Sequence, residues 1–146
     1  MKWRSDLDGA IIESAADAII FADRSGTIRR WNRAASALFG FTEEEALCQS
    51  LDLIVPDDLR AAHWRGFDAA MKIGALKLDG HPTLTRATRK GGQKLYVEMT
   101  FALIVTRGVA EGAVAVARDV TERVLREKAT RAAPPAEAGA AQAPLA

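Results

Sequence analysis

The sequence contains a single cysteine, Cys48, and carries almost no excess of either charge. One cysteine cannot form a disulfide within the chain, and the first ten residues lack the continuous apolar stretch of a secretion signal. We therefore expect a cytoplasmic protein. Twenty Lys and Arg residues against nineteen Asp and Glu residues leave a net charge of +1, so neither a nucleic acid nor a membrane surface is an expected partner.

Long apolar runs and catalytic motifs are also missing. No stretch approaches the ~18 consecutive apolar residues of a membrane-spanning helix. The sequence has no Cys-x-x-Cys-His motif, no His/Cys cluster at zinc-site spacing, no glycine-rich phosphate loop and no Ser, His and Asp spaced as a catalytic triad. These absences favour a sensor or binding domain over an enzyme.

What is present fits one ordinary globular domain. The chain has 146 residues, of which 49% are hydrophobic, enough to bury a core without disulfides. Residues 131–146 consist mainly of Ala, Pro, Gly, Gln and Glu, and a segment with so few large apolar side chains is predicted to be disordered. Because the folded part leaves no room for a kinase or a DNA-binding module, a signal would pass to another chain or to a dimer partner.

Hydrophobic periodicity and turn residues predict the order helix, two strands, short helices, one longer helix, three strands and a final helix. Thr42 and Glu45 match the capping-box pattern of a helix N-terminus. Asp57 is a predicted N-cap of the longer helix, and Gly74 is a predicted stop at its C-terminus. The predicted ranges are helices at 6–18, 33–38 and 57–73, strands at 19–22, 27–31, 83–88, 95–105 and 112–117, and a helix after Asp119.

The longer helix carries a histidine on its apolar stripe. Leu59, His63, Phe67 and then Ala70 or Met71 recur at helical spacing, so His63 is predicted to face the sheet. Alternation in the strand at 95–105 places four apolar residues on one face, also predicted to look inward: Val97, Met99, Phe101 and Leu103. From the residues alone, His63 is either a buried histidine hydrogen-bonded to a carbonyl or a ligand.

Two segments resemble the PAS family. The segment FADRSGTIRRWNRAASALFGFTEEEALCQSL is similar to its opening half, and RKGGQKLYVEMTFALI followed by AVARDVTER is similar to its closing hairpin and the start of its signalling helix. The resemblance implies an α+β fold: a five-stranded antiparallel sheet with short helices over one face and flanking N- and C-terminal helices. The implied parts are an N-terminal helical cap (1–18), the PAS domain (19–119), a C-terminal signalling helix (120–130) and a disordered tail (131–146).

Members of this family share a fold but not a ligand, which is haem, flavin, a small acid or nothing. The flavin-photoreceptor branch has its reactive cysteine within an N-C-R-F-L-Q motif, whereas Cys48 lies in ALCQSL, without the Asn, Arg and Phe. We therefore interpret Cys48 as a small buried or half-buried structural residue and not as a light-sensing one.

The longer helix resembles the haem-binding helix of FixL-type PAS sensors. Their M-P-E-P-Y-R-x-x-H pattern matches Val55-Pro56-Asp57-Asp58-Leu59-Arg60-Ala61-Ala62-His63, with His63 at the position of the proximal iron ligand. The resemblance implies a b-type haem bound through His63 and a sensor of a diatomic gas (O2, CO or NO) or of redox state. A neutral imidazole held on a rigid helix in a dry pocket suits that role.

The distal side departs from the FixL pattern, because Thr83 stands where those domains have an oxygen-responsive arginine. An internal sixth ligand is the alternative that we expect, either Met99 or His81, although Met99 also suits an ordinary core position. The other expected haem contacts are apolar side chains and a cation for the propionates: Phe67, Phe101, Leu103, Val116 and Lys77, with Lys72 as an alternative cation.

Two other functions remain open. The first is a haem-free interaction module, a homodimer assembled through the N-terminal helix and the helix at 120–128, where Val120, Val124 and Lys128 have heptad-like spacing. The second is a sensor of a small organic ligand, which would require polar groups that the inward strand face supplies sparsely. In each case the output would go to a separate signalling protein.

Overall fold

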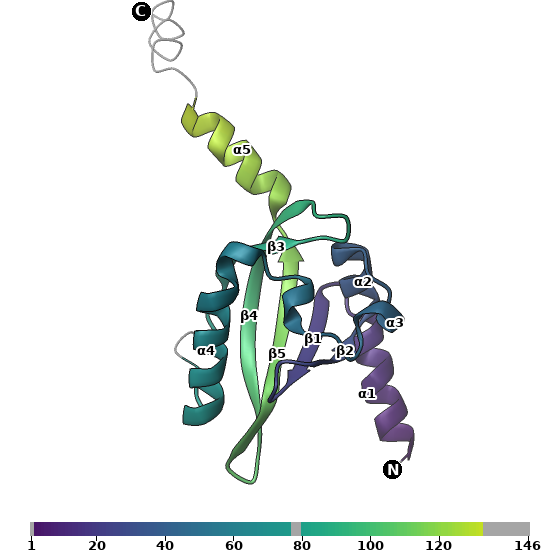
Figure 1. Cartoon of the computed structure of the whole chain (residues 1–146). Coiled ribbons are helices and arrows are strands. Elements are labelled where there is room, and N and C mark those ends of the chain that lie inside the picture. Colours follow the sequence, from purple (N-terminus) through teal and green to yellow (C-terminus); the bar gives the residue numbers. More distant parts are fainter. Residues whose placement is uncertain (1, 77–79, 133–146) are drawn as a thin grey trace, which may run out of the picture.

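The structure of the protein is a computed structural model that describes residues 2–76 and 80–132. It consists of one sheet, helices over one face of the sheet and a helix near each end of the described chain (Figure 1). Within those two ranges no helix combines the length and the apolar character needed to cross a bilayer. The elements are α1 (Lys2–Ser14), β1 (Ala18–Asp23), β2 (Ile28–Trp31), α2 (Arg33–Phe39), α3 (Glu43–Ala46), the short 3-10 helices η1 (Leu51–Leu53) and η2 (Asp57–Leu59), α4 (Arg60–Ile73), β3 (Thr83–Thr88), β4 (Lys94–Thr106), β5 (Val109–Asp119) and α5 (Thr121–Ala132).

The five strands form an antiparallel sheet in the order β2-β1-β5-β4-β3. The last strand in the chain, β5, therefore lies in the centre between β1 and β4 and joins the N-terminal hairpin to the C-terminal one. In Figure 1, α4 runs alongside β4, while α2 and α3 lie near β1 and β2. This arrangement confirms the predicted α+β class, with short helices over one face and flanking terminal helices.

The first helix ends earlier than its apolar pattern predicted. α1 ends at Ser14, whereas the predicted helix continued to residue 18. Ala18 pairs with Ala117 of β5 and is buried, so it belongs to the sheet. The spacing of Ala18 fits both a helix stripe and the inward face of a strand, and the pairing with β5 decides between them.

Asn32, the residue after β2, ties the first helix to the sheet. Its side chain is 1% exposed and makes four hydrogen bonds. The amide oxygen accepts from the backbone N–H groups of Ile19 (2.9 Å) and Ala35 (3.0 Å). The amide nitrogen donates to the carbonyl oxygens of Ile12 (2.8 Å) and Asp17 (3.1 Å). One buried side chain thus bonds to backbone groups of α1, of the link between α1 and β1, of β1 and of α2.

The predicted capping box is confirmed at the start of α3. The Thr42 hydroxyl accepts from the backbone of Glu45 (3.1 Å), and the Glu45 carboxylate accepts from the backbone of Thr42 (2.9 Å). This reciprocal pair orders a helix of a single turn, which intrinsic propensity alone would not stabilise.

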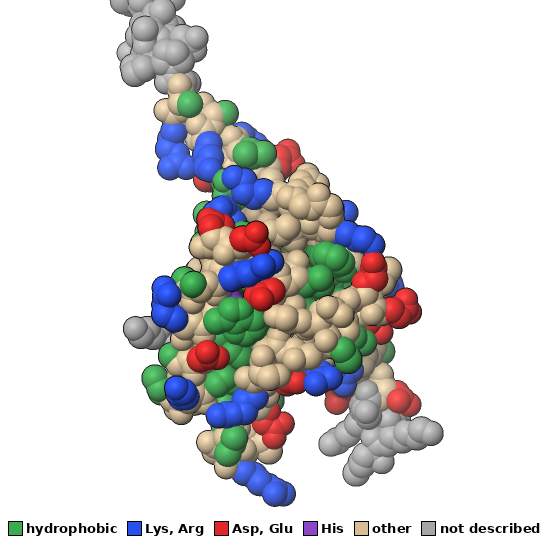
Figure 2. Space-filling view, viewed as in Figure 1, with side chains coloured by type: hydrophobic (Ala, Val, Ile, Leu, Met, Phe, Trp, Pro, Cys, Tyr) green, Lys and Arg blue, Asp and Glu red, His purple; other side chains and the backbone are tan. Residues whose placement is uncertain are grey.

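The last helix packs on the outer face of the sheet, opposite the face that α4 covers. Tyr96, Val120 and Val124 form a buried cluster separate from the main core. The Lys128 ammonium donates to the Tyr96 phenol oxygen at 2.7 Å. The predicted stripe at 120, 124 and 128 therefore contacts Tyr96 of its own chain. Figure 2 shows Lys and Arg side chains gathered along the rest of α5, which extends away from the sheet.

Candidate functional site

Contacts at both ends fix the position of α4, the helix that carries His63. η2 precedes α4, and its Asp57 forms an ion pair with Arg60 (2.9 Å). Asp57 is therefore not the N-cap that the sequence predicted, because the 3-10 turn moves the start of α4 to Arg60 and no side chain caps that end. At the other end, Gly74 has the predicted role, with a φ of 77° and its N–H donating to the carbonyl of Ala70 at 2.8 Å.

The inward stripe of α4 is confirmed from His63 onward and is wider than predicted, whereas Leu59, its first predicted member, belongs to η2. His63 and Phe67 are half-buried and Ala70 and Met71 are buried, at the predicted spacing. Trp64 joins them on the same side, also half-buried. Because His63 and Trp64 are consecutive, the stripe covers more of the helix surface. This width is expected for a helix that packs on a sheet, whereas a coiled-coil helix has a narrower stripe.

The His63 ring lies among aromatic side chains and has a buried nitrogen without a partner. Nδ1 is buried, and no described residue forms a hydrogen bond with it. The Trp64 ring meets the imidazole edge-on at a centroid distance of 4.7 Å, and the Phe67 ring lies at 6.0 Å. Burial lowers the pKa of His63 below its ordinary value, against the weaker opposing charges of Asp52 and Asp68. The neutral imidazole, which is the form that binds metals, is therefore favoured.

Trp64 anchors this part of α4 to the β1–β2 turn. Its indole N–H donates to the Asp52 carboxylate at 2.8 Å. Gly26 lies under the indole so closely that a Cβ there would be 2.2 Å from a ring carbon, and its φ of 81° also favours glycine. The sequence analysis missed Trp64, Asp52 and Gly26, because no periodicity links a turn glycine to a helix 38 positions later (64 − 26).

Asp23 holds the turn on which Trp64 rests. Its carboxylate accepts from the Ser25 hydroxyl (2.6 Å) and the backbone N–H groups of Ser25 and Thr27, and it pairs with Arg29 at 2.8 Å. These contacts, led by the Ser25 hydroxyl, lower the pKa of Asp23 to about 2.

An acid titration of stability should reveal this carboxylate. Because the folded pKa is lowered, the stabilisation is complete above the unfolded pKa of about 3.9 and is lost as the pH falls towards 2. We expect Asp23→Ala to lower the free energy of unfolding by about 1–2 kcal/mol at pH 7, a figure reduced for partial exposure, and by less at pH 3. Urea unfolding at pH 7, 4 and 3 measures the difference. A loss that stays constant over this range would contradict the assignment.

On the sheet side, the predicted inward face of β4 is confirmed. Val97 and Met99 are buried, and Phe101 and Leu103 are half-buried on the same face. Opposite Met99, Phe101 and Leu103 on β5 stand three alanines: Ala117, Ala115 and Ala113. Small side chains cover little of the strand, and Phe101, Leu103, Ala113 and Ala115 are each half-buried on the face that the helices cover.

Thr83 and Met99 are direct cross-strand partners. Directly paired residues share a face of a sheet, so both side chains belong to the inward layer. Thr83 stands where FixL-type domains have an arginine, and Met99 is the candidate sixth ligand. These two positions are therefore neighbours on the inward face. Met99 is 8% exposed and belongs to the main core cluster.

Val116 is not on the inward face, and its predicted place in the pocket is wrong. It pairs with Thr100 of β4, whereas Met99 pairs with Ala117. Because neighbours along a strand point to opposite faces, Val116 lies on the outer face. The predicted strand at 112–117 lies within the longer β5, Val109–Asp119, but the register with Thr100 places the Val116 side chain on the outer face.

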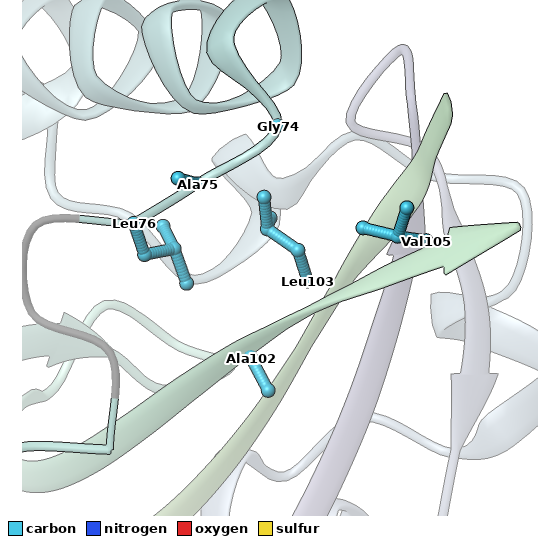
Figure 3. Close-up of a pocket in the computed structure, with 6 residues that line it drawn as sticks. All are labelled: Gly74, Ala75, Leu76, Ala102, Leu103 and Val105. Carbon is cyan, nitrogen blue, oxygen red and sulfur yellow. The ribbon is translucent and has the colours of Figure 1, made fainter. Parts of the chain in front are cut away.

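A cavity of about 280 Å³ lies between the end of α4 and β4. Figure 3 shows Leu103 and Val105 projecting from β4 on the side of the segment after Gly74, while Ala102 projects from the other side of the ribbon. Leu103, a predicted pocket residue, does line this cavity, and the other lining residues are Gly74, Ala75, Leu76, Ala102 and Val105. His63 lies further along α4, towards its start.

The remaining candidates lie away from this layer. His81 is exposed, two positions before β3, and Lys72 is exposed in the last turn of α4. Lys77 lies outside the described residues. The predicted burial of Cys48 is wrong, because the turn after α3 leaves it exposed, with a φ of 69° and an Arg29 N–H 3.6 Å from its sulfur. Among the described residues, no group of three or more His, Cys, Asp or Glu side chains is placed to hold a metal ion.

Comparison with protein families gives a match to the PAS fold over residues 8–120. The chain belongs to the PAS family. The match covers the sheet and the helices over it, and it ends just before α5. PAS domains with solved structures agree with this fold: one from Colwellia psychrerythraea has a TM-score of 0.70 at 20% identity and covers 82% of this chain and 98% of its own. An RNA-binding Light-Oxygen-Voltage receptor has a TM-score of 0.69 at 22% identity, over 87% of this chain and 36% of its own.

Related proteins of known name are much longer than this PAS domain. The oxygen sensor protein DosP of Escherichia coli (strain K12) is 28% identical over 126 residues, which are 84% of this chain and 14% of DosP. The cell-division control histidine kinase PdhS of Brucella ovis is 29% identical over 114 residues, which are 77% of this chain and 10% of PdhS. The matched part is thus a small fraction of each relative.

Proposed function

We propose that this PAS domain is a cytoplasmic sensor that binds b-type haem through His63 and responds to a diatomic gas (O2, CO or NO) or to redox state. The observation that carries the proposal is the buried Nδ1 of His63, which has no hydrogen-bond partner in the described part of the chain. A buried polar atom without a partner is costly. A ligand that bonds to this imidazole, or that brings a hydrogen-bonding group next to it, would remove this free-energy cost.

Three further observations support haem over a purely structural role. The lowered pKa of His63 keeps the imidazole neutral, and axial ligation of haem iron requires the neutral ring. On the inward face, small alanine side chains of β5 stand opposite Phe101 and Leu103, which are themselves only half-buried. The similarity to a protein named as an oxygen sensor extends over 84% of the chain.

The iron of a bound haem would supply the position at which a gas binds or an electron is accepted. The residues of the chain would orient the group and exclude water. The Trp64 indole, fixed by Asp52 and Gly26, restrains the neighbouring imidazole. Phe67 and the inward residues of β4 would cover the porphyrin faces, and Lys77 or Lys72 would pair with the propionates.

The output of the sensor would pass from β4 to α5. The Tyr96 backbone N–H donates to the Thr121 hydroxyl (2.9 Å), and the Val120 N–H donates to the Tyr96 carbonyl (2.9 Å). Tyr96 is three positions from Met99 on the same strand (99 − 96). A displacement of β4 at Met99 would therefore shift the start of α5 and change what that helix presents to a separate signalling protein.

An absorption spectrum tests the proposal. We expect the protein, as isolated or after addition of haemin, to show a Soret band that saturates at one haem per chain. If addition of the protein does not shift the Soret band of haemin, the proposal is contradicted. Free haemin alone does not give a band that saturates at one haem per chain.

Met99 is the proposed sixth ligand, because it lies in the inward layer and His81 is exposed. In the haem-loaded ferrous protein we expect a six-coordinate spectrum without added gas, and Met99→Leu should convert it to a five-coordinate one while retaining haem. Leu is nearly isosteric with Met, so the fold should lose less than about 1.5 kcal/mol. His81→Leu is the matched control. A Met99→Leu spectrum identical to that of the unaltered protein would exclude thioether ligation.

A haem-free dimerisation module is the second candidate, favoured by α1. Leu7 and Ile11, one turn apart on this helix, are 49% and 58% exposed. A second copy of the chain would bury them. We expect light scattering to give a dimer mass for the unaltered chain and a lower mass for the Leu7→Glu/Ile11→Glu variant. A monomer mass for the unaltered chain at micromolar concentration would count against the dimer.

A further inference from the structure

A second hollow lies on the other side of the sheet from the layer of His63. It is a groove of about 530 Å³ between the outer face of β3–β4, η2 and α5. Tyr96 and Arg86 are direct cross-strand partners on the outer face, because the neighbouring Leu95 and Val97 belong to the main core. The groove reaches round the edge of the sheet to η2. Its lining residues are Leu59, Leu84, Thr85, Arg86, Lys94, Tyr96 and Lys128.

Positive charge converges in this groove. The ammonium groups of Lys94 and Lys128 lie 5.5 Å and 4.6 Å from the centre of the Tyr96 ring. In the described part of the chain, neither ammonium has a carboxylate within ion-pair distance, whereas Arg86 is paired with Asp58. The hydrogen bond from Lys128 and the charges of both lysines lower the pKa of the Tyr96 phenol. The Asp58 carboxylate acts on Lys94 only from beyond ion-pair distance. Two cations facing one ring repel each other, and an anion between them would relieve that repulsion.

The rest of the groove is apolar. Leu84 is 53% exposed in it, and Leu59 is half-buried. Because the lysines already lie over the Tyr96 ring, these leucines are the surface available to the non-polar part of a ligand. The volume is within the ~300–1,000 Å³ range of small-molecule sites. Seven lining residues are far fewer than the ~20–30 residues that each side of a stable protein interface contributes, so a small ligand fits better than a protein segment.

We propose that this groove binds a small amphipathic carboxylate, with its carboxylate between Lys94 and Lys128 and its aliphatic part on Leu59 and Leu84. Lys128 belongs to α5, while the other three residues belong to η2, β3 and β4. Binding would therefore hold α5 against the sheet and add a second input to the helix that carries the output. This site does not depend on His63 or on haem.

The test uses decanoate as the probe and the whole chain without haem. In NMR titrations, we expect decanoate to shift the amide signals of Lys94, Tyr96 and Lys128. Lys94→Gln should weaken binding about tenfold, as the loss of one charge-assisted contact predicts. Lys94→Arg should retain binding, and Lys72→Gln, an exposed charge on α4, is the matched control. Lys94 is exposed, so its replacement should leave the fold intact.

Several outcomes would overturn the proposal. The first is equal affinity for decanoate and for uncharged decanol, because the lysines would then not recognise the head group. The second is a set of shifts confined to Met99, Phe101 and Leu103, which would place the ligand on the inward face. The third is unchanged affinity in Lys94→Gln and in Lys94→Gln/Lys128→Gln. A synthetic peptide of alternating Asp and Leu that binds more tightly than decanoate through the same lysines would replace the small acid with a protein partner.

Discussion

His63→Ala should lower the affinity of the domain for haemin by at least about 100-fold. Loss of groups that merely support a metal ligand typically costs about 10- to 100-fold, and here the proposed ligand itself is removed. The fold should survive, because the substitution also removes a buried nitrogen that has no partner among the described residues. Titration of the Soret band, with thermal unfolding measured in parallel, separates a loss of haem from a loss of fold.

Two controls sharpen this experiment. His81→Ala removes the other histidine of the chain, which is exposed, and should leave haemin affinity unchanged. Added imidazole should restore the bound spectrum in His63→Ala, because the variant leaves space for a free ligand where the side chain was. If His63→Ala binds haemin as tightly as the unaltered protein does, the iron is held elsewhere and the proposed site is wrong.

Asn32→Leu should be among the most destabilising single substitutions in the chain. Leucine is branched at the same carbon as asparagine but is bulkier and offers no hydrogen bond, so two backbone N–H groups and two carbonyl groups lose their bond to this side chain at a position that is 1% exposed. We expect the free energy of unfolding to fall by about 3–5 kcal/mol, which is the range for a broken buried network. Urea unfolding followed by circular dichroism measures this change.

Asn32→Asp is the informative companion to that variant. It keeps the oxygen that accepts from Ile19 and Ala35 but replaces the nitrogen that donates to Ile12 and Asp17. Asn32→Asp should therefore also cause a large fall in the free energy of unfolding, and it should loosen α1 more than α2. A loss below about 1 kcal/mol for Asn32→Leu would mean that these contacts do not connect α1 to the sheet as described.

Periodicity predicted most of the sheet, because alternation and turn residues are local signals. The strand at 83–88, the glycine turn after it and the inward residues of β4 needed only neighbouring positions. The errors arose where a distant contact decides. Ala18 leaves the helix pattern because Ala117 pairs with it, and Val116 faces outward because register with Thr100 places it there. Register between strands depends on the whole sheet, so one strand's composition does not determine it.

The candidate site could be predicted from the sequence only in part. The helix spacing placed His63 correctly on the inward stripe, since three- and four-residue intervals define a helix face. The contact of Trp64 with Gly26 could not be predicted, because it joins a helix to a turn. A glycine with positive φ gives one signal of a turn, but nothing in its neighbours indicates which side chain lies over it.

The groove beside Tyr96 shows the same limit. Lys94 and Lys128 are ordinary surface lysines in the sequence, 34 positions apart (128 − 94), and only the packing of α5 on β4 brings both to one ring. The heptad-like spacing in α5 correctly indicated that Val120 and Val124 are buried on one side of the helix, with Lys128 next along it. Its partner, however, is Tyr96 of the same chain, which periodicity does not reveal.

The most direct test of the proposed haem site is a crystal structure of the chain loaded with haemin. We predict that a ring nitrogen of His63 lies within bonding distance of the iron, with the porphyrin between α4 and the inward face of β4 and β5. Iron bound to another residue, or a haemin-treated crystal in which the His63 ring is hydrogen-bonded to a carbonyl with no porphyrin beside it, would contradict this account.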